Sequence, residues 1–198
     1  MEALNTPAIE TERLLLRRFR PEDIPALFSI YGDREVNTYL PWRPLASCQE
    51  AERLFENEYA AAYREPRGYR YAVCLKADDI PIGYVHVDPE GARDLGYALS
   101  RAFWHQGIAV EAARAAAAQA KQDGLPFITA THDVNNPRSG SVMRALGMRY
   151  QYTYREQWQP KDIPVTFRLY QLNLDGNETR VYWKYWERYA VHNIEDLS

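Results

Sequence analysis

The chain has 198 residues, a formal net charge of −3, and 46% hydrophobic and 26% charged residues. This length suits one domain with its own core, and the composition excludes disordered, collagenous and disulfide-rich proteins. The weak negative charge supplies no broad positive field for a phosphate backbone, so we expect no nucleic acid partner. No stretch approaches the roughly 18 apolar residues of a spanning helix, and no leader-like N-terminus stands out. We therefore expect a cytoplasmic protein with no membrane partner.

The N-terminal part of the chain contains patterns for one strand and two helices. Leu14 and Leu16 lie on one face of the run 11–19, which predicts a strand. After Pro21-Glu22-Asp23, apolar residues at 24, 27, 28 and 31 have the spacing of an amphipathic helix. Ser47 and Glu50 have the spacing of a capping box, and inward apolar positions continue to 62. We therefore expect a second helix that begins at Ser47.

The middle of the chain changes to short strands. The β-rich runs 69–75 and 80–87 predict a hairpin, and 94–99 predicts a third strand. Gly96 inside that third strand indicates a bulge or a closely approaching backbone. The alanine-rich segment 110–122 stops at Asp123-Gly124, as a helix does.

The remaining segments alternate strand and helix before a final hairpin. We expect a strand at 127–131, a helix at 136–146, a hairpin of 150–158 with 165–173, and a helix at 179–191. A strand, helix, strand order implies some parallel pairing through a right-handed crossover. The predicted class is therefore a mixed α/β protein.

The two cysteines and the other ligand-type residues point to no disulfide and no metal. Cys74 lies in an apolar strand-like run and Cys48 at a helix start, so we expect two reduced, unreactive thiols. No Cys/His or carboxylate spacing typical of a metal site is present in the sequence.

The segment from Asp94 to Glu111 combines a strand, a glycine-containing loop and a helix N-terminus. Unpaired N–H groups and the positive end of the helix dipole favour an anion at such a place. Gly107 lets the backbone approach a phosphate, and Ala109 leaves the first turn uncluttered. The chain has neither a G-x-x-x-x-G-K-S/T motif nor a G-x-G-x-x-G motif after a strand. A phosphate site of another type is therefore expected, although a glycine that only closes the turn would look the same.

Several motifs, taken in order, resemble the GNAT superfamily of N-acetyltransferases, and in particular its RimJ/RimL-like branch. They are Thr11-Glu12-Arg13-Leu14-x-Leu16-Arg17 with Pro21-Glu22-Asp23, Leu95-Gly96-Tyr97, Trp104-x-x-Gly107-x-Ala109 followed by Glu111-Ala112, Asn136-x-x-Ser139, and Leu146-Gly147-Met148. The match spans about residues 11–173. It departs from the family pattern at Trp104, where arginine or glutamine is usual, and at Ala109, where a second glycine is usual. Backbone N–H groups do most of the binding in such a loop, so these changes need not remove it.

The resemblance implies the acyl-CoA N-acyltransferase fold, a mostly antiparallel mixed sheet with a central parallel pair flanked by helices. It implies a GNAT domain at 1–175 and a C-terminal helical extension at 176–198 on the same domain. It also implies acetyl-CoA as cofactor, with its pantetheine arm near Leu99 in a gap opened by a strand bulge. The residues expected to bind this cofactor are Ala98, Leu99, Ser100, Trp104, His105, Gln106, Gly107, Ile108, Ala109, Val110, Asn136 and Ser139.

The resemblance further implies direct attack of an amine on the thioester. Ser139 is expected to protonate the departing thiolate, and Asn136 to hold the cofactor arm. An amine is mostly protonated at neutral pH, so a base must accept its proton. Glu156 is the expected base, while Asp94, His86 and His132 remain alternatives.

Two groups of aromatic residues are left open. Tyr31, Tyr39, Trp42, Tyr63 and Tyr97 are expected either to line the acceptor pocket or to pack in the core. The cluster Tyr182, Trp183, Tyr185, Trp186 and Tyr189 is expected to cover a sheet edge or to form a homodimer contact.

The expected function is acetylation of a primary amine, either a protein N-terminus or a small molecule. The alternatives are an acyltransferase for an antibiotic or other small amine with a different acyl donor, and a non-catalytic acyl-CoA sensor.

Overall fold

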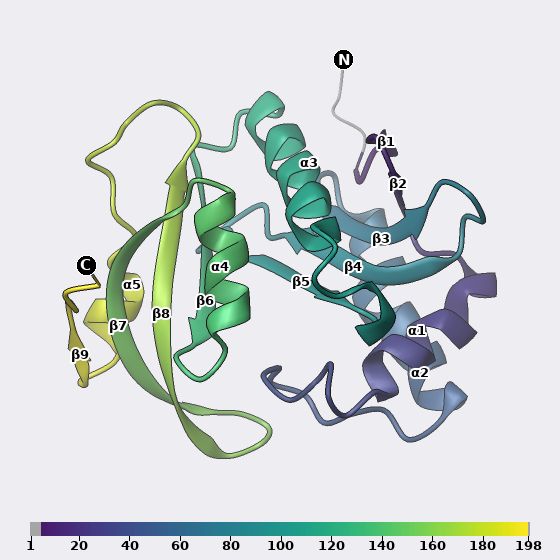
Figure 1. The fold of residues 1–198 in the computed structure, drawn as a ribbon, viewed down its shortest axis with the longest axis horizontal. Coiled ribbons are helices and arrows are strands. Elements are labelled where there is room, and N and C mark those ends of the chain that lie inside the picture. The colour runs from purple at the N-terminus through teal and green to yellow at the C-terminus, as the bar shows by residue number, and fades with distance from the viewer. Residues whose placement is uncertain (1–4, 198) are drawn as a thin grey trace.

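The computed structural model describes residues 5–197, which form two antiparallel sheets placed side by side (Figure 1). The first sheet has the strand order β1 (Ile9–Glu10), β2 (Leu14–Arg17), β3 (Tyr69–Leu75), β4 (Pro81–Val87), β5 (Leu95–Leu99). The second has the order β6 (Phe127–Asp133), β8 (Ile163–Asn173), β7 (Arg149–Trp158), β9 (His192–Asn193). Every hydrogen-bonded neighbour pair within each sheet is antiparallel.

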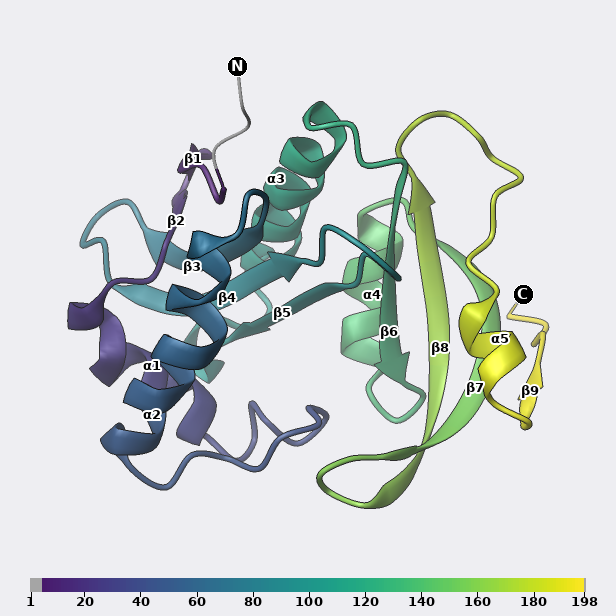
Figure 2. The same cartoon turned by 180° about the vertical axis from the view of Figure 1, so that it is seen from behind.

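Helices cover both faces of the sheets. Figure 1 shows α3 (Ile108–Gln122) and α4 (Pro137–Ala145) on one face. Figure 2 shows α1 (Ile24–Gly32) and α2 (Cys48–Leu54) on the opposite face of the first sheet, and α5 (Lys184–Arg188) against the second sheet. A π-helical stretch, Phe55–Ala60, extends α2, and single 3-10 turns lie at Pro21–Asp23, Ala62–Arg64 and Arg101–Phe103. Within residues 5–197, no helix is both long and apolar enough to cross a bilayer.

The two sheets meet at one parallel junction. A single bridge joins Asp94 to Thr129, and the Thr129 N–H donates to the Arg93 carbonyl at 3.1 Å. Beyond this point β5 and β6 run in the same direction without a shared ladder. The expected parallel pair is therefore held at one end only, and α3 and α4 begin where its two strands end. In open α/β sheets, ligands bind beyond such strand ends.

The patterned side chains form the core that the periodicity predicts. Leu14 and Leu16 are fully buried, as the alternation in β2 requires. The buried face of α3 consists of Ile108, Ala112, Ala113, Ala116, Ala117 and Ala120. Small side chains let this helix lie close to the first sheet. Ser47 caps α2 by accepting from the Glu50 N–H at 3.2 Å, but the Glu50 carboxylate accepts from Ala46, not from Ser47 as a full capping box would require.

The predicted bulge at Gly96 is wrong. β4 and β5 pair in unbroken register from Gly83 opposite Leu99 to Val87 opposite Leu95. The glycine is needed for a different reason, because a Cβ at position 96 would lie 2.6 Å from Nε2 of His86. Gly96 thus makes room for the imidazole of its cross-strand neighbour.

The predicted helix at 179–191 is also wrong in extent, since only α5 is helical there. Side chains of β8 hold the preceding segment extended: Gln171 donates to the Arg180 carbonyl at 2.8 Å and accepts from the Tyr182 N–H at 2.8 Å. The Tyr152 hydroxyl donates to the Tyr182 carbonyl at 2.5 Å. These tertiary hydrogen bonds override the helical spacing of the aromatic residues.

Candidate functional site

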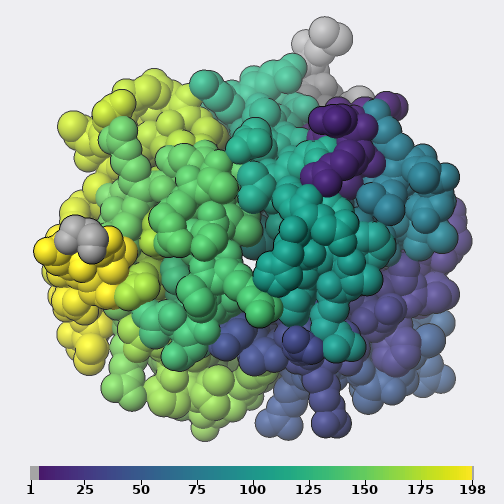
Figure 3. All heavy atoms as spheres, viewed as in Figure 1, coloured from purple at the N-terminus to yellow at the C-terminus, as the bar shows by residue number. Residues whose placement is uncertain are grey.

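A cleft of about 1180 Å³ lies where β5 and β6 diverge. Figure 3 shows its opening between the green atoms around α4 and the teal atoms around the start of α3. Residues from both sheets and from the neighbouring loops and helices line it: most of 35–42, His86, 94–99, most of 103–110, most of 131–143, the even-numbered positions 154–158 of β7, and Tyr185, Arg188 and Tyr189. The cleft therefore joins the expected cofactor loop to parts of the chain that are distant in sequence.

The N-terminus of α3 forms a concave group of N–H donors at one end of this cleft. Gly107 is the N-cap with φ 74°, a left-handed conformation that favours glycine. His105 also has a positive φ, 60°, so the loop folds back sharply just before the helix. The first-turn N–H groups, from Ile108 onwards, and the helix dipole favour an anion at this place.

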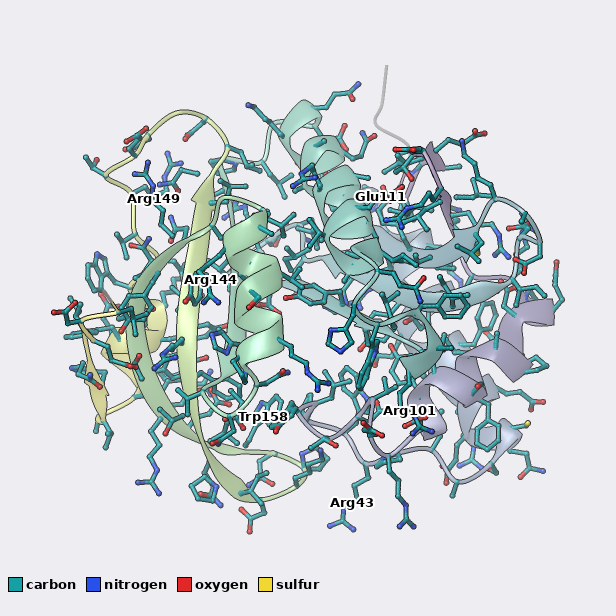
Figure 4. All side chains as sticks on the ribbon, in the orientation of Figure 1. Arg43, Arg101, Glu111, Arg144, Arg149 and Trp158 are labelled. Atoms are coloured by element: carbon teal, nitrogen blue, oxygen red, sulfur yellow. The ribbon has the colours of Figure 1, made fainter. Side chains whose placement is uncertain are left out.

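Glu111, which is labelled in Figure 4, connects this loop to Thr11 and Arg13. The Glu111 carboxylate accepts from the Thr11 hydroxyl at 2.6 Å, the Arg13 N–H at 3.0 Å and Arg13 Nε at 2.7 Å. Arg13 Nη1 also donates to the Gln106 carbonyl at 2.9 Å. The sequence motif at 11–13 is thus explained by a contact with the first turn of α3, which sequence spacing alone could not reveal.

The outer edge of β5 offers backbone groups to the cleft. Ser100 donates to Ile82 at 2.8 Å, and Asp88 donates to Asp94 at 3.0 Å. In an antiparallel ladder, every second residue of a strand directs its N–H and C=O groups to the neighbouring strand. On β5 these are the even-numbered residues, so Tyr97 and Leu99 direct their backbone groups away from β4 and toward the gap. One of these backbone groups, the Leu99 carbonyl, already accepts from Nε1 of Trp104 at 2.7 Å. The others suit the amide-containing arm of a coenzyme A molecule, so the residues present fit this cofactor.

Ser139 and Tyr97 form a pair of hydroxyls on the α4 side of the cleft. Their oxygens lie 2.9 Å apart, and the Tyr97 hydroxyl also lies 2.9 Å from the Ser139 carbonyl, to which it can donate. Burial raises the pKa of Tyr97, so the phenol keeps its proton at neutral pH. Tyr97 packs with the core beside α3, on the face of β5 opposite Ala98, and partners the serine there.

Carboxylates and a neutral histidine lie on the other side of β5. Tyr84 packs with α1 side chains and Ala98, and the alternation places His86, Gly96 and Asp94 on that same side. Burial, reinforced by the charge of Asp88, raises the pKa of Asp94 to about 7. Burial lowers the pKa of His86 to about 3, so its imidazole stays neutral.

Glu156 lies near three tyrosines that we call the tyrosine group: Tyr154, Tyr185 and Tyr189. The Tyr154 ring lies 5.1 Å from that of Tyr185 and stacks on that of Tyr189 at 5.0 Å. Burial and then the Glu156 carboxylate raise the pKa of Tyr189 to about 12. Burial raises the pKa of Tyr154 and Tyr185 too, with contributions from both Glu156 and Asp94. Both carboxylates therefore act on the same two rings.

The β7–β8 hairpin closes the rim of the cleft against the loop 33–46, and Figures 1 and 2 show the two segments side by side. Lys161 at the hairpin tip donates to the carbonyls of Asn37 at 2.9 Å and Thr38 at 3.1 Å. Trp158, labelled in Figure 4, lines the cleft next to this contact. Arg101 pairs with Asp33 on the other side of the loop at 2.9 Å.

The structure brings most of the sequence-predicted site residues to the cleft. Those that line it are Ala98, Leu99, Trp104, His105, Gly107, Ile108, Ala109, Val110, Asn136, Ser139 and Glu156, together with the alternatives Asp94, His86 and His132. Ser100 and Gln106 do not line it. The Ser100 N–H is bonded to β4, and the Gln106 side chain donates to Ala102 at 2.8 Å.

The aromatic predictions divide in the same way. Tyr39, Trp42 and Tyr97 line the cleft, but Tyr31 and Tyr63 do not. The Tyr31 and Tyr59 hydroxyls bond to each other at 2.7 Å inside the core, and the Tyr63 hydroxyl donates to the Arg70 carbonyl at 2.9 Å. The C-terminal aromatics cover the outer face of β7 and β8, and β9 pairs with the edge of β7. Sequence reasoning missed that Tyr185 and Tyr189 also reach the cleft.

Curated proteins resemble this chain along most of its length. It is 25% identical over 171 residues to YoaA of Bacillus subtilis, covering 84% of this chain and 96% of that protein. It is 28% identical over 196 residues to YnaD of the same species, covering 95% and 97%. Both relatives are described as uncharacterised N-acetyltransferases.

Solved structures share the fold at low identity. A GNAT-family acetyltransferase from Bacillus anthracis has a TM-score of 0.74 at 22% identity, over 85% of this chain and 99% of that one. RimL, a ribosomal L7/L12 α-N-protein acetyltransferase in complex with coenzyme A, has a TM-score of 0.74 at 17% identity, over 86% and 100%. Spermidine N-acetyltransferase from Vibrio cholerae, in complex with CoA and spermine, has 0.70 at 15%, over 83% and 97%. These likenesses confirm the predicted mixed α/β fold.

A family model described as the acetyltransferase (GNAT) domain matches residues 13–149, from the arginine that anchors the α3 loop to the start of β7. This match covers more than half of the chain and includes the loop, the β5 edge and the Ser139 helix. The chain therefore belongs to the GNAT acetyltransferase family, whose members transfer an acetyl group from acetyl-CoA to an amine.

Proposed function

We propose that this cleft binds acetyl-CoA on its α3 and α4 side and a primary amine on its α1 and α5 side. The observation that carries the proposal is the placement of the α3 N-terminus at the end of a strand whose outer edge is open to the cleft. Backbone N–H groups between Trp104 and Val110 would hold the diphosphate, and the free backbone edge at Tyr97 and Leu99 would hold the pantetheine arm. When bound, acetyl-CoA supplies the carbonyl carbon with which the amine nitrogen forms a bond as the C–S bond breaks.

Asp94 is the carboxylate that we propose accepts the amine proton. A base works best when its pKa lies near the working pH, and Asp94 combines a pKa of about 7 with a position on the acceptor side of β5. Glu156, the expectation from sequence, also lines the cleft and is the alternative that the tests below distinguish. His86 is neutral and has the wrong pKa for this task at neutral pH.

Ser139 and Tyr97 are proposed to deliver a proton to the leaving thiolate. When the Tyr97 hydroxyl donates to the Ser139 hydroxyl, the serine proton is free to be donated into the cleft. The Tyr97 phenol is protonated at neutral pH, and burial raises its pKa further, so it can donate to the serine oxygen while the serine donates into the cleft. Asn136 lines the cleft at the N-terminus of α4, where its side chain is proposed to hold the cofactor arm.

We also propose that the chain falls in the RimJ/RimL-like branch, and that residues 176–198 extend a domain formed by 1–175. The likeness of the fold to RimL supports the branch. The packing of the C-terminal aromatics on β7 and β8 supports the second proposal, because this segment shares a hydrophobic core with the domain.

Calorimetry and thiol release test the proposal together. We expect acetyl-CoA to bind the purified chain, and a panel of primary amines to produce free thiol at rates that depend on the amine. Tight binding without amine-dependent release would instead indicate a non-catalytic acyl-CoA sensor. If titration with acetyl-CoA released no heat, this would contradict the proposal that the cleft binds this cofactor.

Ser139→Ala is expected to lower kcat by roughly 10- to 100-fold while the Kd for acetyl-CoA changes by less than about threefold, since a proton donor acts on the leaving group. Tyr97→Phe should lower kcat in the same direction, because it removes the proton that supplies the serine. Single-turnover kinetics and calorimetry on the same samples make the comparison. An unchanged rate for Ser139→Ala would remove this serine from the mechanism.

A further inference from the structure

The acceptor side of the cleft has two carboxylates without a countercharge. Asp94 lies at the junction of β5 and β6, and Glu156 lies on β7. Within residues 5–197, neither carboxylate forms an ion pair. A ligand that contacts both residues therefore meets the Glu156 carboxylate at one point and, above about pH 7, the Asp94 carboxylate at another.

The tyrosine group lines the same cleft as these two carboxylates. The charges of Asp94 and Glu156 both raise the pKa of Tyr154 and of Tyr185, and the charge of Glu156 raises the pKa of Tyr189. Tyr154, Glu156 and Trp158 alternate on one face of β7, so their Cα atoms are about 7 Å apart in turn. Asp94, Tyr154, Glu156 and Trp158 thus all line this side of the cleft, with Trp158 at the rim. Aromatic faces next to carboxylates are a favourable environment for an organic cation.

Two arginines, Arg138 and Arg188, also line the cleft, but neither forms an ion pair with Asp94 or Glu156. Arg138 lies on the α4 side, with its guanidinium 5.5 Å from the Trp104 ring. Arg188 is exposed, with its guanidinium 5.3 Å from the Tyr189 ring, and its charge lowers the pKa of Tyr189, but Glu156 has the larger effect there and raises it.

The rim favours a slender ligand. Lys161 ties the β7–β8 hairpin to the loop 33–46 through two carbonyl groups, so the halves of the molecule are joined next to Trp158. A flexible small amine can pass such a rim more easily than the N-terminus of a folded protein.

We propose that the acceptor is a slender amine with a second positive charge, such as an α,ω-diamine, and that Glu156 with the tyrosine group recognises this second charge. The proposal rests on the function proposed above and gives the two carboxylates different roles. Asp94 faces the amine that reacts, and Glu156 faces the ammonium that does not. Glu156 is then a specificity residue whose loss affects KM rather than kcat.

Butane-1,4-diamine and butylamine test this division because they differ only by the second charge. We expect the wild-type chain to use the diamine with a kcat/KM at least roughly tenfold higher, since one charged contact contributes about that factor or more. Glu156→Gln should raise KM for the diamine by roughly 10- to 100-fold and leave butylamine within about threefold. Glu187→Gln is the matched control, because it removes an exposed α5 carboxylate that does not line the cleft.

Three outcomes would overturn the proposal. One is a wild-type enzyme that does not prefer the diamine, and another is one that prefers an uncharged peptide with a free α-amine. The third is a Glu156→Gln variant that loses kcat equally on both amines and loses the pH dependence near neutrality, which would make Glu156 the proton acceptor. In each case acetyl-CoA binding and amine-dependent thiol release would remain, so the function proposed above is tested separately. Tyr185→Leu gives a second measurement and should weaken the diamine alone.

Discussion

Asp94→Asn is expected to lower kcat by roughly 100- to 10,000-fold, because it removes the group proposed to accept the amine proton. In the wild-type protein the pKa of Asp94 is about 7, so this carboxyl is neutral below that pH and becomes a usable base above it. The rise of kcat/KM through about pH 7 should therefore vanish in Asp94→Asn. Asp88→Asn should move the same rise to lower pH, since the charge of Asp88 helps to hold the pKa of Asp94 up. A full rise retained in Asp94→Asn would contradict this assignment.

The same variant should be more stable than the wild type at alkaline pH. An aspartate whose pKa is raised by folding binds its proton more tightly in the folded state. The wild-type protein thus loses stability as the pH rises from about 4, the unfolded value, to about 7. The full shift would correspond to about 4 kcal/mol, but solvent at this half-buried site reduces it to ~1–2 kcal/mol. We expect Tm at pH 8.5 to rise by about 3–6 °C and Tm at pH 4 to change little, as measured by scanning calorimetry.

Gly107→Val is expected to weaken acetyl-CoA and free CoA binding by roughly 10- to 100-fold and to equal extents, because both ligands carry the same diphosphate. The φ of 74° at this N-cap strains any β-branched residue, so the loop must change its course and redirect the N–H groups of the first turn. Isothermal titration with both ligands measures the effect.

Gly124→Val is a matched control at the other end of the same helix. Gly124 has φ 80°, is exposed, and has open space around the position of a Cβ. We expect similar backbone strain and a similar loss of Tm, with no change in CoA affinity. If both variants lose affinity alike, the effect comes from the stability of α3 and not from the direction of the N–H groups in its first turn.

Local patterns in the sequence were sufficient for most helices and strands. Alternating leucines in β2, the alanine face of α3 and the serine cap of α2 are set by neighbours a few residues away. The phosphate loop belongs to the same class, since a glycine before a helix N-terminus is both the signal and the site.

The failures came where distant segments meet. The aromatic spacing at 179–191 resembled a helix, but hydrogen bonds from Gln171 and Tyr152 keep much of that segment extended. The sequence around Gly96 predicts a bulge or a close backbone, because its sequence neighbours do not show that the His86 ring lies across from it. For Tyr97 the sequence leaves acceptor pocket and core packing open, and only the fold shows that it packs beside α3 with its hydroxyl against Ser139.

The sequence by itself determined the family, the order of the elements and the loop at the start of α3, because each depends on residue types at short spacing. Only the tertiary structure decided which carboxylate has a pKa near 7, and that α5 adds tyrosines to the cleft. Burial and charge proximity create those properties, and they arise where β5, β7 and α5 come together from far apart in the chain.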